Sequence, residues 1–231
     1  MQGKVATARA VVIGLGATGC ALLPLVSALD LSCIHLVDGD TVEAGNLVRQ
    51  RLFAPDDVGK LKVLAACARI APLAPGIAWT TIPHFIDAAN IAMVLRDADL
   101  VADCTDDLAA RAVIERTCRS MNIPLVTGAV HGHQVQVITC QGPDHSRRRS
   151  GFFQGRASEG QQSCDMQRVP AAVTTLTASL MAMRIADLLV GGDGLAGVMD
   201  LVDAEHGRWM RIMGPDAGEF MDTPIRPSQH A

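Results

Sequence analysis

Residues 10–29 read AVVIGLGATGCALLPLVSAL, and this stretch indicates the fold class. A β-branched run from Val11 to Ile13 leads into the turn GLGATG, and an Ala/Leu-rich run follows it. A G-x-G-x-x-G turn between a strand and a helix lets phosphate groups approach backbone N–H groups at the helix N-terminus. The stretch therefore predicts a nucleotide-binding strand–turn–helix built on Gly14, Gly16 and Gly19, although a glycine turn without a ligand has the same pattern.

The same twenty residues carry no charge, and Lys4 and Arg9 precede them. A secretory signal or a membrane span can have this composition. The glycines and Pro24 interrupt the apolar run, so we interpret it as part of a globular protein and expect no membrane partner. Proline inside a helix removes a backbone hydrogen bond, so we expect Pro24 to kink or shorten the helix.

Length and composition favour one domain with a large apolar core. The chain has 231 residues, of which 49% are hydrophobic and 19% charged, and this length fits a single domain. Its formal net charge is −4, so it lacks the basic excess of nucleic-acid-binding proteins, and we expect no nucleic-acid partner. None of the seven cysteines lies closer than thirteen positions to the next. This spacing excludes a CxxC zinc half-site, so we expect no zinc. The odd number of cysteines in a chain of this length favours reduced thiols and a cytoplasmic location.

Strand-like and helix-like segments alternate along the chain. The pattern predicts an α/β fold: a Rossmann-like, mostly parallel sheet with helices on both faces, extended by C-terminal antiparallel strands. We expect strands at 10–13, 33–37, 77–83, 100–103, 124–130, 134–139, 197–201 and 209–213. We expect helices at 18–29, 60–70, 90–95, 108–121 and 173–190. Residues 1–213 would form the single domain, with a flexible crossover loop at about 141–165 and a disordered tail at 214–231.

Polar residues follow the second expected strand. Asp38 ends that strand nineteen residues after Gly19, where a carboxylate can accept hydrogen bonds from ribose hydroxyls. The next residues gather amides and cations, namely Asn46, Arg49, Gln50, Lys60 and Lys62. An NAD-dependent enzyme needs a nicotinamide pocket here, whereas arginine and lysine together suit a triphosphate. A solvated surface turn is the alternative for this segment taken alone.

The fourth expected strand ends in acidic residues. Leu100–Asp103 is followed by Cys104-Thr105-Asp106-Asp107. Ligands of open α/β sheets bind at the carboxyl ends of the strands, and a carboxylate beside phosphates is a natural Mg²⁺ ligand. Alternatively, Asp106 or Asp107 caps the helix expected at 108–121.

Taken in order, GLGATG, DGDTVEAGNLVRQRLF, DVGKLK and DCTDD resemble the motifs of the ThiF/MoeB/HesA family of ubiquitin-activating-enzyme-like adenylyltransferases. The resemblance continues through IPLVTGAV and TASLMAMRIADLLVGG and covers roughly residues 3–203. It implies an ATP- and Mg²⁺-dependent adenylyltransferase that activates the C-terminal glycine carboxylate of a small ubiquitin-like or sulfur-carrier protein ending in Gly-Gly. The acyl-adenylate can then pass to a thiol, and the resemblance also implies a homodimer.

The resemblance also implies roles for single residues. Asp38 would bind the ribose, Asp106 would hold magnesium, and the remaining nucleotide-binding positions are Gly14, Gly16, Gly19, Asp40, Asn46, Arg49, Gln50 and Lys62. Arg49, Lys62 and Asp106 would be catalytic. Cys164 falls where ThiF-like proteins carry a cysteine of sulfur-transfer or thioester chemistry, and its neighbours are polar, so we expect a reactive thiol there; a surface thiol without a role is the alternative.

Three departures from the family pattern leave other functions open. The chain begins at Met1-Gln2-Gly3-Lys4 without the family's N-terminal helix and its arginine, the paired CxxC site is absent, and Asp107 replaces the usual asparagine. The chain could therefore be a non-catalytic partner of another activating subunit. Two further alternatives are a tRNA threonylcarbamoyl-adenosine dehydratase of the same superfamily, disfavoured by the acidic composition, and an NAD-dependent oxidoreductase, disfavoured by the arginine and lysine residues after the second expected strand.

Overall fold

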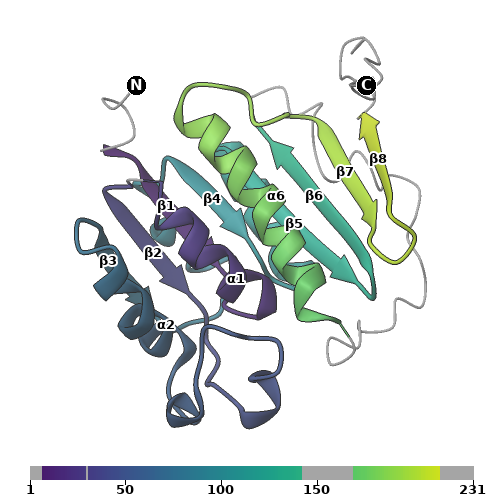
Figure 1. Cartoon of the computed structure of the whole chain (residues 1–231). Helices are drawn as coiled ribbons and strands as arrows, with labels where there is room; N and C mark the ends of the chain where they lie inside the picture. The colour runs from purple at the N-terminus through teal and green to yellow at the C-terminus, as the bar shows by residue number, and fades with distance from the viewer. Residues whose placement is uncertain (1–6, 30, 142–168, 214–231) are drawn as a thin grey trace.

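The computed structural model describes residues 7–29, 31–141 and 169–213. These residues form one eight-stranded sheet in the order β3-β2-β1-β4-β5-β6-β7-β8 (Figure 1). The strands are β1 (Arg9–Ile13), β2 (Cys33–Val37), β3 (Ala78–Ile82), β4 (Leu100–Asp103), β5 (Leu125–His131), β6 (Gln134–Cys140), β7 (Val198–Asp203) and β8 (Arg208–Met213). Strands β1 to β5 pair in parallel, and β6 to β8 continue the sheet in antiparallel fashion. The predicted fold class is confirmed.

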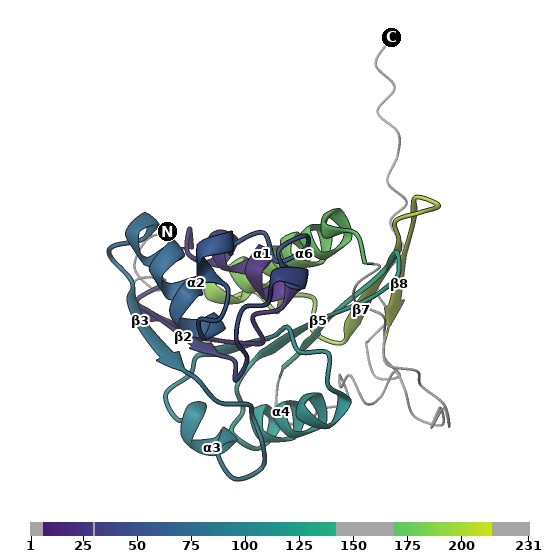
Figure 2. The same cartoon turned by 90° about the horizontal axis from the view of Figure 1, so that it is seen from below.

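Helices cover both faces of the parallel part of the sheet. They are α1 (Ala17–Val26), α2 (Lys62–Ile70), α3 (Ile91–Val94), α4 (Leu108–Ser120) and α6 (Ala171–Leu189). Figure 2 shows α1, α2 and α6 on one face and α3 and α4 on the other. Val12 belongs to the apolar core on the first face and Val11 to the core on the second. Both valines are buried, as expected for a parallel strand covered on its two faces.

The element boundaries differ from the predicted ones for identifiable reasons. Helix α1 includes Pro24 and ends at Val26, so the expected shortening is confirmed. Helix α2 begins at Lys62, two residues later than predicted, because Leu61 pairs with Thr41 and the carbonyl of Lys60 accepts a hydrogen bond from Val42. Short 3₁₀ turns at Ala44–Asn46, Pro55–Asp57 and Ala71–Leu73 were not predicted.

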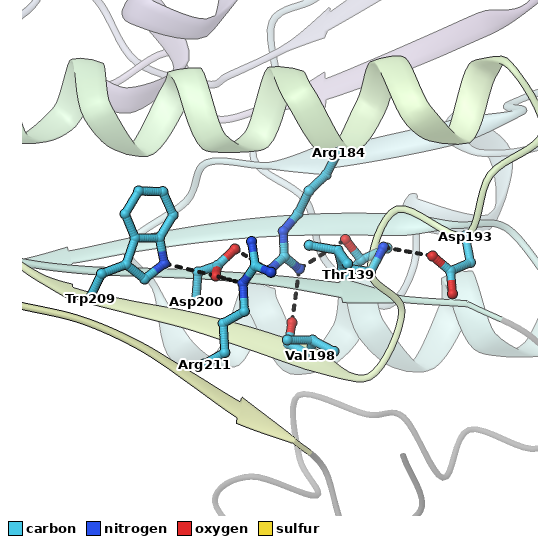
Figure 3. Close-up of polar contacts among 8 residues, drawn as sticks. Thr139, Arg184, Asp193, Val198, Asp200, Trp209 and Arg211 are labelled. Carbon is cyan, nitrogen blue, oxygen red and sulfur yellow. Dashed lines mark hydrogen bonds and ion pairs between the residues drawn. The ribbon is translucent and has the colours of Figure 1, made fainter. Parts of the chain in front are cut away.

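Helix α6 holds the antiparallel strands to the rest of the fold. By length and composition alone it could span a membrane, but its apolar residues pack against β5, β6 and α1. Its buried Arg184 donates to Asp200 of β7 across 2.6 Å, and Trp209 and Arg211 of β8 donate to the other carboxylate oxygen of Asp200 (Figure 3). One buried carboxylate therefore joins α6, β7 and β8.

Two predicted segments, the crossover loop at about 141–165 and the tail at 214–231, lie almost entirely outside the described residues, and so does Cys164. The apolar stretch 10–29 forms strand β1, a turn and helix α1, as the globular interpretation expected.

Candidate functional site

The glycine turn connects β1 to α1 at the carboxyl edge of the sheet. Gly14 has a φ of +90° and its N–H donates to the carbonyl of Val37, a conformation that favours glycine. A Cβ on Gly19 would lie 2.0 Å from the carbonyl oxygen of Gly14, whereas a Cβ on Gly16 would meet no atom within 4 Å. Gly19 is therefore required for packing inside the turn, and Gly16 leaves open space above the N-terminus of α1.

Asp38 joins the end of β2 to the glycine turn. One of its carboxylate oxygens accepts the backbone N–H of Leu15 at 2.6 Å, and the other accepts that of Asp40 at 2.8 Å. The side chain is buried. Each carboxylate oxygen can accept more than one hydrogen bond, so Asp38 can hold the turn and still accept ribose hydroxyls.

A pocket of about 570 Å³ opens at this edge of the sheet. Its walls come from the glycine turn, the segments after β2, β3 and β4, and the start of α4. The lining includes these predicted residues: Gly14, Gly16, Asp38, Asp40, Asn46, Arg49, Gln50, Lys62 and Asp106. Gly19 lies behind the turn. The structure thus brings together residues that the sequence separates by up to 92 positions, from Gly14 to Asp106.

Cations and amides from the chain after β2 line the pocket. Lys62 is buried, and its Nζ lies 2.8 Å from a carboxylate oxygen of Asp40. Arg49 donates to the side-chain oxygen of Asn46 at 2.9 Å. Gln50 is buried as well, and its side-chain oxygen has no hydrogen-bond partner in the described part of the chain. This oxygen is therefore available to accept a hydrogen bond from a donor group of a ligand in the pocket.

Lys60 does not belong to the pocket, although it lies two residues from Lys62. Its Nζ pairs with Asp57 at 3.1 Å, and Arg69 of α2 pairs with the same carboxylate. Burial opposes ionisation of Asp57, but hydrogen bonds from the Ala54 N–H, Lys60 and Arg69 outweigh it and lower the pKa of this carboxyl. Lys60 thus fixes the turn before α2, and the sequence grouping of the two lysines was misleading.

Asp106 and Asp107 both line the pocket but differ in their contacts. Asp107 caps α4, because its side chain accepts the N–H of Ala110 at 2.6 Å. Asp106 is exposed and has no hydrogen bond or ion pair with any residue that the structure describes. Within the same residues no group of three His, Cys, Asp or Glu side chains could hold a metal. A cation at Asp106 would take its other ligands from phosphates and water, as Mg²⁺ commonly does.

Two polar or aromatic residues after β3 are among the pocket residues that were not predicted from the sequence. His84 and Phe85 follow β3, and Phe85 is 65% exposed with its ring against Gly39. A flat aromatic face at the rim offers a surface on which a planar base can stack. Their position in the sequence could have predicted them, because the residues that follow β3 reach the same edge of the sheet as those that follow β1, β2 and β4.

Cys104 also lines the pocket. Burial raises the pKa of its thiol well above the ordinary value, so Cys104 remains protonated and is a poor nucleophile.

Known proteins resemble this chain in sequence and in fold. Residues 1–217 match the ThiF family. The molybdopterin-synthase adenylyltransferase of Escherichia coli is 33% identical over 208 residues, covering 88% of this chain and 82% of that protein. The sulfur carrier protein ThiS adenylyltransferase of the same organism is 27% identical over 222 residues, covering 91% and 84%.

Solved structures share the fold. Escherichia coli MccB with ATP superposes with a TM-score of 0.79 at 19% identity, covering 91% of this chain. PaaA superposes with a TM-score of 0.73 at 20% identity. Our chain spans 65% of the length of each of these longer chains. The match over residues 1–217, together with the similarity to most of the length of the molybdopterin-synthase adenylyltransferase, shows that this chain belongs to the ThiF family.

Proposed function

We propose that this chain is an ATP- and Mg²⁺-dependent adenylyltransferase that activates the C-terminal glycine carboxylate of a small sulfur-carrier or ubiquitin-like protein. The observation that carries the proposal is the composition of the pocket lining, which combines Lys62, Arg49 and Gln50 from the chain after β2 with the carboxylate of Asp106, unpartnered within the described chain, from the segment after β4. The names of the relatives, which are adenylyltransferases of sulfur-carrier systems, support the same reaction.

The reaction needs two anions held together. An oxygen of the carrier's carboxylate attacks the α-phosphorus of ATP, the bond from that phosphorus to the bridging oxygen breaks, and pyrophosphate leaves with the electron pair. The carboxylate is already ionised at neutral pH, so no general base is required. Catalysis then depends on positioning and on stabilising charge at the phosphate oxygens.

The pocket residues fit these requirements. The cationic groups of Lys62 and Arg49 would neutralise phosphate oxygens, and the side-chain N–H groups of Gln50 would donate to them. Asp38, fixed by two backbone N–H groups, would bind the ribose. Asp106 would hold Mg²⁺, which when bound would supply further positive charge at the triphosphate.

We extend the proposal to a second step at Cys164. Its thiolate would attack the carbonyl carbon of the acyl-adenylate, the bond to AMP would break, and the thiol proton would pass to solvent, which leaves a thioester. The polar sequence around Cys164 supports this assignment. Cys164→Ser should keep pyrophosphate exchange but lose a thiol-labile adduct with the carrier, as measured by intact mass. An adduct that survives this substitution would remove Cys164 from the mechanism.

We also propose a cytoplasmic homodimer that binds neither nucleic acid nor membrane, on the basis of the family, the odd number of cysteines and the net charge of −4. Light scattering at micromolar concentration tests the assembly. A fully active monomer would contradict it.

ATP–pyrophosphate exchange with a panel of proteins ending in Gly-Gly tests the main proposal. Exchange should depend on the carrier and should disappear when its last two glycines are removed. Absence of exchange with every carrier, combined with stimulation of a second activating subunit, would favour a non-catalytic partner. Turnover of threonylcarbamoyl-adenosine tRNA would indicate a tRNA dehydratase, and turnover of NAD would indicate an oxidoreductase.

A further inference from the structure

Arg111 is a buried arginine to which the reaction above assigns no role. It lies on α4, one turn after Asp107, and is only 5% exposed. Its Nη2 donates to the backbone carbonyls of Thr105 and Gly128, the latter at 2.9 Å. Its Nε has no partner among the residues described. A guanidinium is costly to bury, so its two backbone contacts need an explanation.

The two carbonyls lie where β4 and β5 separate. Strand β4 ends at Asp103, whereas β5 continues to His131. The N–H of Val101 donates to the carbonyl of Pro124 in this parallel pair. Continued in steps of two residues, the same register would bring the N–H of Thr105 to the carbonyl of Gly128.

Thr105 instead turns away from the sheet. Its N–H donates to a carboxylate oxygen of Asp103 at 3.0 Å, and its hydroxyl donates to the same oxygen at 2.7 Å. Thr127 of β5 donates to the other oxygen of Asp103 at 2.8 Å. Arg111 therefore replaces the missing N–H at Gly128 and simultaneously holds the carbonyl of Thr105.

This arrangement fixes the backbone on both sides of Asp106. Thr105 is held through its N–H, hydroxyl and carbonyl, and Asp107 is held as the cap of α4. The segment also lies against the glycine turn, because a Cβ on Gly14 would be 3.0 Å from the backbone nitrogen of Thr105. The side chain of Asp106, with no partner of its own in the described chain, is positioned only through this backbone.

We infer that Arg111 is a positioning residue for Asp106. By holding the Thr105 carbonyl, it sets the place from which the Asp106 carboxylate faces the pocket. The inference depends on the proposed function only for what Asp106 binds; the restraint on the segment is independent of it.

The test measures ATP affinity calorimetrically with Mg²⁺ and with EDTA. Arg111→Met should reduce the Mg²⁺-dependent gain in ATP affinity about tenfold and leave affinity in EDTA unchanged, because only the carboxylate's position is lost. Arg111→Lys, which retains a cation and a donor, should recover part of the gain. Arg184→Lys is the matched control, since Arg184 is equally buried and also donates to a backbone carbonyl, that of Val198, outside the pocket. It should keep the full gain.

A double-variant cycle separates positioning from general destabilisation. Arg111→Met should add no further loss to Asp106→Asn, because both act through one carboxylate. Hydrogen exchange supplies a readout without nucleotide: the amides of Thr105 to Asp107 should exchange faster in both Arg111 variants and at the wild-type rate in Arg184→Lys.

Losses that add in the double variant, or unchanged exchange in both Arg111 variants, would overturn the inference. If Asp106→Asn itself keeps the Mg²⁺-dependent gain, the magnesium assignment of the proposed function is wrong, and hydrogen exchange alone then decides whether Arg111 restrains the segment. Should Arg111→Met fail to fold, Arg111→Lys carries the same measurements.

Discussion

Lys62 and Asp40 form an ion pair within the pocket, with 2.8 Å between Nζ and the carboxylate oxygen. The backbone N–H of Lys62 also donates to the carbonyl of Asp40, so two contacts join the start of α2 to the segment after β2. The lysine side chain is 7% exposed and that of the aspartate 55%. A buried cation thus has one accessible counter-ion, which a phosphate can replace.

Lys62→Met should raise the activation free energy of pyrophosphate exchange by about 2–4 kcal/mol, because it removes a preorganised charge that stabilises the transition state. Lys60→Met is the control and should leave the exchange rate near the wild-type value, since Lys60 lies outside the pocket lining and pairs with Asp57. Equal losses in the two variants would contradict the assignment. Steady-state exchange kinetics at saturating ATP make the comparison.

The neighbours Asp106 and Asp107 should give opposite phenotypes. Asp106→Ala should abolish Mg²⁺-dependent exchange without changing the melting temperature, because its side chain has no partner in the described chain. Asp107→Ala should lose about 1 kcal/mol of stability, the usual value of a helix cap, and retain measurable exchange, because the magnesium carboxylate and the Arg111 contact to Thr105 remain. Normal exchange by Asp106→Ala would rule out the magnesium assignment.

Gly16 and Gly19 should also separate binding from folding. A Cβ at position 16 has open space around it, so Gly16→Ala should fold normally and bind ATP more weakly, because the methyl group intrudes where phosphate approaches the helix N-terminus. Gly19→Ala places a Cβ against the backbone of Gly14 and should cost about 1–3 kcal/mol in stability. Urea unfolding and ATP titration distinguish the two. A stable Gly19→Ala protein would show that the turn can relax.

Acid should weaken the contact between α6 and β7. Burial opposes ionisation of Asp200, but donors from Arg184, Trp209 and Arg211 outweigh it and lower the pKa of this carboxyl. The stabilisation is therefore complete above the unfolded-state pKa of about 4 and is lost as the pH falls through the lower folded-state pKa.

Asp200→Asn should cost about 3–5 kcal/mol at pH 7, because Arg184 is left as a buried charge without its counter-ion. Its free energy of unfolding should also depend less on pH below about pH 4 than that of the wild type. Urea unfolding between about pH 3 and pH 7 measures both effects. A neutral-pH stability equal to that of the wild type would show that the pair contributes nothing.

The sequence predicted the fold and the charged and amide residues after β2 that line the pocket, because both depend on local signals. The glycine turn directly follows β1, and Asp38 and the residues from Asn46 to Gln50 follow β2. Each is a short motif whose position depends on the end of a single strand. The sequence grouped Lys60 with the pocket residues, but only Lys62 lines the pocket. The two lysines flank Leu61, whose pairing with Thr41 is a contact between residues distant in the sequence and could not be predicted from local signals.

Arg111 and Phe85 escaped prediction for different physical reasons. Arg111 lies four residues after Asp107, a spacing typical of an exposed ion pair on a helix. Its burial depends on β5 extending beyond the end of β4, which the sequence alone does not show. Phe85 belongs to no motif, and only the assembled sheet edge brings it to the pocket.

The order of the strands places a tryptophan at each edge of the sheet, so that fluorescence can test whether the two edges unfold together. The chain has two tryptophans, Trp79 on β3 and Trp209 on β8, and these strands are the opposite edges of the sheet. Trp79→Phe and Trp209→Phe variants would each emit from one edge only. If α6 and Asp200 join the antiparallel strands to the parallel core as one cooperative unit, the emission change in each variant will have the same urea midpoint as the loss of circular dichroism in that variant. Separate midpoints would divide the sheet into an independently melting nucleotide half and a detachable antiparallel flank.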